Sequence, residues 1–254
     1  MLFRSLEECV RLSPSASAYY LLSLASYNDK NYDQAIKYSQ KARSKHATRF
    51  EVYYVCGRAY FEKGDFKSAQ DEFALAKANV SFDAGLWFAS ATTLEAMKKY
   101  HEASVEYDQL LSNGSFRDTA NFRSAVSKIK SEITEDYPRA SVQLDQYIHS
   151  LPDNADKSLP YAWKAFAYLR IDSITASADA ISQAKKSNEN NAMLQLVLAC
   201  RSAKAEDFES ACIFLERALA SKSFSKEDIE GIEMLGILKK KSKKYKTLMQ
   251  QYFP

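Results

Sequence analysis

The chain of 254 residues contains 46% hydrophobic and 26% charged residues, which is typical of a globular protein with a substantial core. Only 6 glycines and 5 prolines are present, so an all-β fold with many tight turns is disfavoured and helices are favoured. The net charge is +3, but six lysines lie in the run Lys239–Lys246, so the remaining residues carry a net charge of about −3. A near-neutral body argues against a nucleic-acid-binding face along the whole chain.

The first predicted element is a helix over residues 2–12, LFRSLEECVRL. Leu2, Leu6 and Cys9 fall on one face of this helix, so they are expected to pack against another helix. The segment matches the second half of the helix pairs that follow, but no first half precedes it. Residues 1–15 are therefore predicted as an N-terminal half repeat.

Residues 16–150 are predicted to form four helix pairs. The clearest pair is Phe50–Asn79, in which the turn Lys63-Gly64-Asp65 separates two runs of apolar residues with helical spacing. In the fourth pair three additional residues lengthen the first helix or its turn, and Pro138 is expected in the first turn of the second helix.

The link around residues 150–158 is the most loop-like part of the sequence, and a hinge is predicted there. Residues 151–224 are predicted to form two further helix pairs. Residues 225–254 are predicted to form a terminal capping pair, in which Ser225 and Asp228 make a capping box.

Three columns of residues recur through these pairs. The second helix of each pair opens with an aromatic or large apolar residue, and the spacings are 34, 34, 37, 37, 34 and 37 residues: Tyr32, Phe66, Tyr100, Tyr137, Ile174, Phe208 and Tyr245. Three positions later lies a small or apolar residue: Ala35, Ala69, Ala103, Ala140, Ser177, Ala211 and Leu248. The first helices carry a third column of small residues, where helices are expected to approach closely: Ser23, Gly57, Ala91, Ala125, Ala165, Ala199 and Gly236.

A 34-residue period with these residue types resembles the tetratricopeptide repeat (TPR) family over nearly the whole chain. The resemblance implies an all-α, right-handed superhelical solenoid of helix–turn–helix repeats, in which the first helices line the concave face. The C-terminal carboxylate clamp of some TPR modules is not supported, because Tyr20, Leu24 and Val55 replace its Lys and Asn residues.

The resemblance also implies which side chains point into the concave groove. These positions are mostly apolar or aromatic, so the groove is expected to bind an apolar helical or extended segment of a partner protein. The alternative is that the same aromatics pack between neighbouring repeats. The predicted contact residues are Tyr20, Leu24, Tyr27, Tyr54, Arg58, Phe61, Phe88, Thr92, Phe122, Arg123, Trp163 and Phe166, with Arg58 and Arg123 as isolated cations that each bind one acidic group.

No catalytic or metal-binding motif is found in the sequence. His46, His101 and His149 lie in different repeats with no metal-ligand spacing, and no glycine-rich phosphate loop or GxSxG elbow is present. The four cysteines form no CxxC motif and fall on apolar helical faces, which favours buried free thiols in a reducing compartment. No enzyme activity, cofactor, metal or small-molecule substrate is therefore expected.

The sequence thus predicts a non-catalytic protein–protein interaction scaffold or adaptor of the cytoplasm or nucleus, with no membrane span. One alternative is a structural subunit of a large multiprotein assembly that stacks through its repeat ends. A second is a nucleic-acid-binding helical repeat that uses the C-terminal lysines, whose simpler explanation is a charged, solubilising helix end.

Overall fold

The structure, a computed structural model, describes residues 2–46 and 48–254, except for the side chains of residues 2–5 and 9. Every regular element in these ranges is a helix, and the described residues form no strand. The chain divides into two compact units, Met1–Ser131 and Glu132–Pro254, which we describe separately. The hinge predicted near 150–158 lies inside the second unit and stays a prediction.

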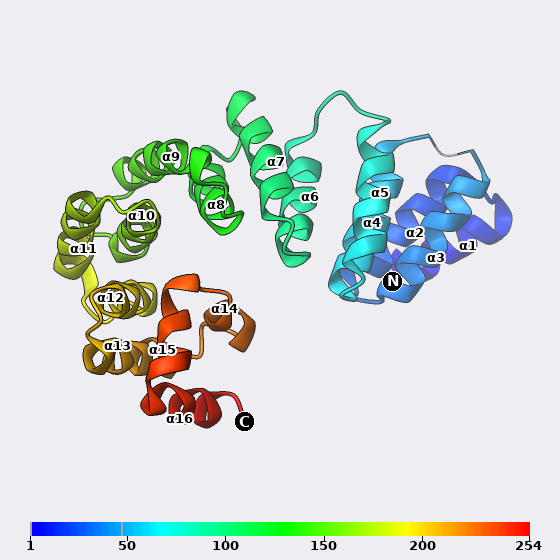
Figure 1. Ribbon diagram of the computed structural model, residues 1–254. Helices are drawn as coiled ribbons and strands as arrows, with labels where there is room; N and C mark the ends of the chain where they lie inside the picture. The colour runs from blue at the N-terminus through cyan, green and yellow to red at the C-terminus, as the bar shows by residue number, and fades with distance from the viewer. Residues whose placement is uncertain (1, 47) are drawn as a thin grey trace. The chain divides into compact units, whose positions relative to one another are not determined.

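The first unit consists of one helix followed by three helix pairs and the first helix of a fourth (Figure 1). The first helices of successive pairs contact each other, α2 with α4 and α4 with α6. Its helices are α1 (Leu2–Leu12), α2 (Ala16–Asn28), α3 (Tyr32–Ser44), α4 (Phe50–Glu62), α5 (Phe66–Lys77), α6 (Ala84–Ala96), α7 (Tyr100–Ser112) and α8 (Arg117–Lys130).

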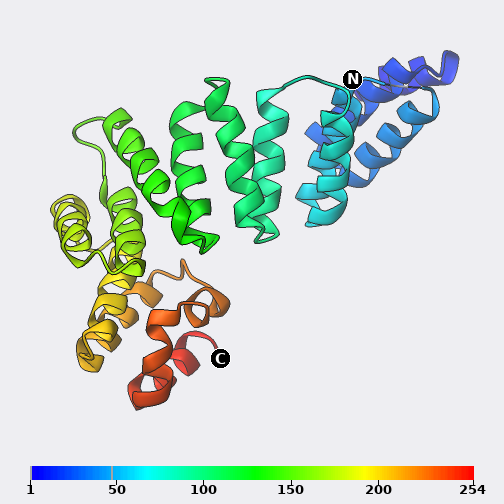
Figure 2. The ribbon, with the colours of Figure 1, turned by 45° about the horizontal axis from the view of Figure 1, so that its top comes forward.

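In the second unit, first and second helices of a repeat also alternate. Helix α10 packs antiparallel against α11, and α12 against α13 (Figures 1 and 2). The additional residues of the fourth repeat form a short 3-10 helix, η1 (Thr134–Asp136), before α9. The remaining elements are α9 (Tyr137–Ser150), α10 (Ser158–Arg170), α11 (Ile174–Asn188), α12 (Ala192–Lys204), α13 (Phe208–Ala220), α14 (Lys226–Glu230), η2 (Glu233–Leu235), α15 (Gly236–Lys241) and α16 (Lys243–Tyr252). The predicted all-α solenoid of helix–turn–helix repeats is confirmed.

The two columns of the second helices have clear structural roles. The aromatic or large apolar residue is the first residue of α3, α5, α7, α9, α11 and α13, and only Tyr245 lies two residues inside its helix. The small residues three positions later are all buried, from Ala35 at 0% exposure to Leu248 at 3%. Pro138 lies in the first turn of α9, and Ser225 and Asp228 form the predicted capping box.

Gly57 on α4 shows why the first helices need small residues. A Cβ atom at this position would lie 2.6 Å from Cε1 of Phe73 on α5 and 3.1 Å from the carbonyl oxygen of Ala69. The fully buried Phe73 ring therefore packs directly on the backbone of α4. Absence of a side chain at Gly57 is what allows this contact.

The same prediction is wrong for Gly236. Nothing lies within 4 Å of a Cβ atom built at this glycine, so it allows no close helix approach. The reason is that the first helix of the terminal pair is not continuous but is divided into α14, η2 and α15. The predicted stripe of α1 is untested, because the side chains of Leu2 and Cys9 lie outside the described residues.

Five turns between paired helices share one backbone geometry. The residue two positions before the opening residue of the second helix has a positive φ, between 57° and 78°, and only one of the five is glycine: Lys30, Gly64, Lys98, Asp172 and Glu206. In the third pair the N–H of Lys98 donates to the carbonyl of Glu95 and the N–H of Lys99 to that of Leu94, which is a Schellman termination of the helix. The other turns repeat these two hydrogen bonds.

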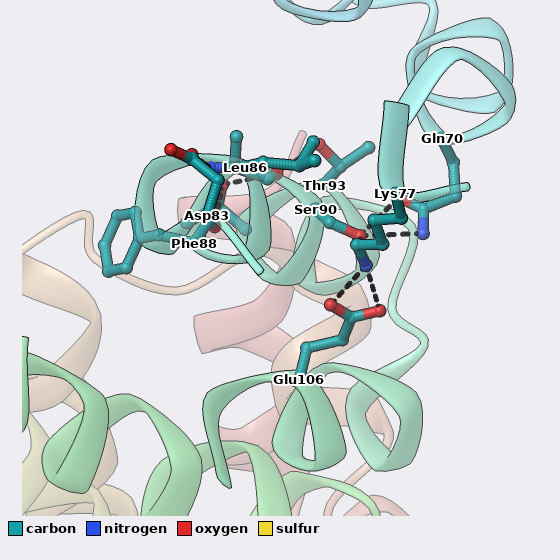
Figure 3. Close-up of polar contacts among 10 residues, drawn as sticks. Gln70, Lys77, Asp83, Leu86, Phe88, Ser90, Thr93 and Glu106 are labelled. Carbon is teal, nitrogen blue, oxygen red and sulfur yellow. Dashed lines mark hydrogen bonds and ion pairs between the residues drawn. The ribbon is translucent and has the colours of Figure 1, made fainter. Parts of the chain in front are cut away.

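Polar contacts tie neighbouring repeats together on one side of α6 (Figure 3). Lys77 on α5 forms an ion pair with Glu106 on α7 and donates a 2.8 Å hydrogen bond to Oγ of Ser90 on α6. Gln70, two turns earlier on the same face of α5, donates to the same Ser90 hydroxyl at 3.0 Å. Burial lowers the pKa of Lys77, while Glu106 favours its charged form. Phe88 points away from this cluster (Figure 3), so the other side of α6 is free to form a different surface.

Candidate functional site

A cleft of about 330 Å³ lies in the first unit between α4 and α6. Its volume is at the lower end of the range of about 300–1,000 Å³ that is usual for ligand pockets. Half of the lining residues are aromatic, and the lining contains one cationic and one anionic side chain: Tyr54, Arg58, Phe61, Glu62, Phe73, Gly85, Phe88, Ala89, Thr92 and Phe116.

Helical spacing explains how the two walls are built. Tyr54, Arg58 and Phe61 follow each other on α4 at intervals of four and three residues, so they share one face of the helix. Phe88 and Thr92 are four residues apart on α6 and share a face in the same way. The structure thus brings five of the predicted contact residues together in one cleft.

Arg58 supplies the positive charge of the cleft. Its guanidinium lies 4.5 Å from the ring centre of Tyr27 on α2 and 5.7 Å from that of Tyr54, so cation–π contacts hold it over two rings. Burial raises the pKa of both tyrosines, and the nearby guanidinium partly offsets this. Tyr27 donates its hydroxyl to Glu62 at 3.4 Å, which keeps the Glu62 carboxylate beside the tyrosine.

Phe116 closes one side of the cleft and was not predicted. It immediately precedes α8, has φ 48° and ψ 34°, and is 52% exposed. A left-handed backbone is unusual for a bulky residue, and it places this ring 5.3 Å from the ring of Phe88. Sequence reasoning missed Phe116 because it lies in a link rather than in a helical column; an aromatic residue directly before a first helix is the only signal.

Gly85 and Phe73 were also missed. A Cβ atom on Gly85 would lie 3.2 Å from the hydroxyl oxygen of Tyr54, so the glycine lets this tyrosine approach α6 closely. Phe73 packs 6.1 Å from the Tyr54 ring and forms part of the cleft lining.

The prediction that Arg123 is an isolated cation is wrong. Glu95 on α6 accepts hydrogen bonds from Nη1 of Arg123 at 2.6 Å, from the Tyr107 hydroxyl at 3.0 Å and from the Ser127 hydroxyl at 2.9 Å. Burial raises the pKa of the Tyr107 hydroxyl, and the Glu95 carboxylate raises it further. The three donors come from α7 and α8, so Glu95 serves to join three helices.

The remaining predicted contact residues lie outside the cleft. Tyr20, Leu24 and Phe122 are half-buried, and Arg49 lies 5.6 Å from the ring centre of Tyr20. In the second unit Trp163 packs edge-on against Phe166 at 6.0 Å between ring centres. Phe166 is only 5% exposed, so it offers little surface to a partner.

The comparisons with known proteins agree with this architecture. Residues 16–42 match the family model described as tetratricopeptide repeat. The FK506-binding protein 5 of Rhizopus delemar is 48% identical over 40 residues, which are 16% of this chain and 10% of that protein. The chain therefore matches only about a tenth of the length of this curated relative.

Solved structures resemble a larger part of the chain. YrrB, described as a TPR protein with an unusual peptide-binding site, has a TM-score of 0.66 at 14% identity, with 74% of this chain and 95% of YrrB covered. A tetratricopeptide repeat protein from Parabacteroides merdae has a TM-score of 0.54 at 16% identity and covers 92% of this chain and 90% of its own.

Residues 16–42 thus match a tetratricopeptide repeat, and the chain has the fold of solved TPR proteins. TPR repeats are in general non-catalytic modules that bind other proteins, so this TPR chain is a protein-interaction scaffold in that general sense. At 14–16% identity the solved TPR structures establish the fold and do not identify a partner.

Reactive groups in the described part of this TPR chain are few. His46, His101 and His149 are exposed on three different segments, and no three potential metal ligands cluster among the described residues. Cys56, Cys200 and Cys212 are buried free thiols, and burial raises the pKa of Cys56 and Cys200 to about 12. Within the described ranges every helix is too short or too polar to cross a bilayer.

Proposed function

We propose that this TPR protein is a non-catalytic adaptor that holds an apolar segment of a partner protein in the cleft between α4 and α6. The observation that supports the proposal is the aromatic lining of the cleft, to which both helices and the link before α8 contribute. An aromatic surface of this kind is favourable for a partner because burying one large apolar side chain stabilises a complex by about 1.5–3 kcal/mol.

The cleft also has the mixed character that recognition sites usually have. Phe61 and Phe88 are half-buried, so each ring is fixed by packing and still has surface to offer. Arg58 and Glu62 are exposed polar groups at the same cleft. Apolar surface with a few placed polar groups gives both affinity and orientation.

A double variant with Phe61→Asp and Phe88→Asp tests the proposal. Two carboxylates in the aromatic cleft should reduce affinity for a captured partner about 100-fold or more, since two large apolar contacts are lost. The matched control is Leu75→Asp with Val105→Asp, which changes two exposed apolar residues, 46% and 49% exposed, on α5 and α7. Partners are captured from the source cells on each immobilised variant and identified by mass spectrometry, with circular dichroism as the check of folding.

A photo-crosslinking residue at Thr92 gives an independent test, because Thr92 lines the cleft whereas Ala74 is an exposed residue of α5. The proposal predicts crosslinks to the partner from position 92 and none from position 74. It is wrong if the Phe61 and Phe88 variant and its control capture the same partners equally well.

A further inference from the structure

We propose that the cleft selects partner segments that carry one internal Asp or Glu beside a large apolar side chain, and that Arg58 is the residue that determines this specificity. This inference rests on the proposed function, since it names the chemistry of the segment that the same cleft would bind.

The first argument is that Arg58 has no carboxylate partner. The described residues include no carboxylate within ion-pair distance of its guanidinium, although Glu62 is one helical turn away. Two other arginines of the first unit, by contrast, form ion pairs, Arg43 with Glu72 at 3.0 Å and Arg123 with Glu95 at 2.6 Å. Arg58 is therefore the one cationic side chain of the cleft lining, and it forms no ion pair with a described residue there.

The second argument is that Arg58 is held in position for a ligand. Its guanidinium packs over the rings of Tyr27 and Tyr54 at 4.5 and 5.7 Å, yet the residue is exposed. The guanidinium also hydrogen-bonds to the hydroxyls of Tyr27 and Tyr54, and the rest of its five N–H donors can bind a carboxylate. Less side-chain entropy is lost on binding than for a freely rotating cation.

The third argument limits the ligand to a single acid. Glu62 also lines the cleft, and Asp83 lies at the N-terminus of α6 beside Gly85. A run of acidic residues would bring further negative charges close to these two carboxylates and would be repelled. One carboxylate on Arg58 avoids this repulsion.

The fourth argument favours an internal acidic side chain over a C-terminal carboxylate. Arg58 is the only cationic side chain of the lining, and the Thr92 hydroxyl donates within its own helix, to the carbonyls of Phe88 at 3.1 Å or Ala89 at 2.9 Å. Capture of a chain end by several converging donors is therefore not supported. A side-chain carboxylate can be bound by the guanidinium group of Arg58 alone.

The apolar neighbour follows from the spacing on α4. Phe61 lies three residues after Arg58, a rise of about 4.5 Å along the helix. Alternate side chains of an extended segment point the same way and lie about 6.6–6.8 Å apart. An acid and a large apolar residue separated by one residue can therefore reach Arg58 and the ring of Phe61 together.

A random heptapeptide library, displayed between two constant flanks so that no peptide has a free C-terminus, provides the test. The full chain is panned against it as wild type, Arg58→Gln, Arg58→Glu and the control Arg117→Glu. Arg117 is an exposed arginine at the start of α8 and lies outside the cleft lining. A second library with free C-termini distinguishes chain-end capture.

Wild type and Arg117→Glu should enrich peptides with one Asp or Glu near Phe, Leu or Trp. Arg58→Gln should lose the acid preference, and Arg58→Glu should replace it with a preference for Lys or Arg. Changing the acid of a selected peptide to its amide should weaken binding to wild type about tenfold or more, as expected for a lost charge-assisted hydrogen bond.

The inference is overturned if Arg58→Glu keeps the acid preference, if enrichment occurs only with free C-termini, or if a second copy of the chain displaces the peptides. If the selected peptides need Phe88 but show no acid preference, the inference fails while the proposed function stands. If no peptide is enriched by wild type over the Phe61→Asp and Phe88→Asp variant, both fail.

Discussion

Gly57→Ala should destabilise the first unit although alanine is the better helix former. The exchange gains about 0.8–1.0 kcal/mol of helix propensity. Against this, the new Cβ atom would lie 2.6 and 2.7 Å from two carbons of the Phe73 ring and 3.1 Å from the Ala69 carbonyl oxygen. Phe73 has 0% exposure and cannot move into solvent, so overpacking should cost about 1–3 kcal/mol. The expected net change is a loss of about 1 kcal/mol in the free energy of unfolding.

Urea unfolding followed by Trp87 fluorescence measures this loss. Trp87 lies on α6 in the first unit, and Trp163→Phe removes the only other tryptophan, so the signal reports on the first unit. The same exchange in a Phe73→Leu background is the control, because a shorter side chain removes the clash. There Gly57→Ala should gain up to about 0.8 kcal/mol from helix propensity.

The Gly57→Ala and Phe73→Leu variants together form a double-mutant cycle that measures the coupling between the two residues. If Gly57→Ala changes stability equally in both backgrounds, the contact between Gly57 and Phe73 has no energetic role. A stabilising effect in the wild-type background would show that α4 and α5 can separate at negligible cost.

Three further predictions concern other parts of the chain. Lys98→Gly should raise the thermal midpoint, because it removes a left-handed non-glycine residue at φ 58° and gains about 0.5–1 kcal/mol; an unchanged or lower midpoint would contradict this. Hydrogen bonds from Ser158 and Asn188 lower the pKa of Asp156 to about 2, so its stabilising effect is present above its unfolded pKa of about 3.9 and is lost as the pH falls towards 2. An acid titration followed by circular dichroism should therefore be flatter for Asp156→Asn, and an unchanged profile would contradict this. Glu95→Gln should reduce the free energy of unfolding of the first unit, measured by urea unfolding, by about 1–3 kcal/mol, because its charged acceptor is lost; an unchanged free energy of unfolding would count against the three-helix role of Glu95.

The repeated helices could be predicted because packing constraints recur at a fixed spacing in the sequence. Ala35, Ala69 and Ala103 are all fully buried in the core of the first unit. The prediction of a close helix approach was wrong at Gly236, because a glycine at this spacing does not indicate whether the helix around it is continuous. The left-handed turn residues were missed because only Gly64 has the residue type that signals this backbone.

The candidate site could be predicted only in part, for a different physical reason. Helical spacing predicts Tyr54 and Arg58 on one helix face and Phe88 on the face of another helix, and in the structure the three residues line one cleft. Ion pairing between helices depends on side-chain rotamers and on residues nearly one repeat apart, so the partner of Arg123 was not visible in the sequence. Phe116 lies outside every periodic column, so residue spacing could not predict it as part of the cleft lining.

The hydrogen bonds to Glu95 have a consequence for how tightly the cleft could bind a ligand. Two of its donors also flank Phe88: the Arg123 guanidinium lies 5.8 Å from the Phe88 ring centre, and the Tyr107 ring meets it edge-on at 5.9 Å. The position of Phe88 is thus set by the folded chain before any ligand arrives. A preorganised wall of this kind loses little conformational freedom on binding, so a short peptide could reach useful affinity over a small buried area.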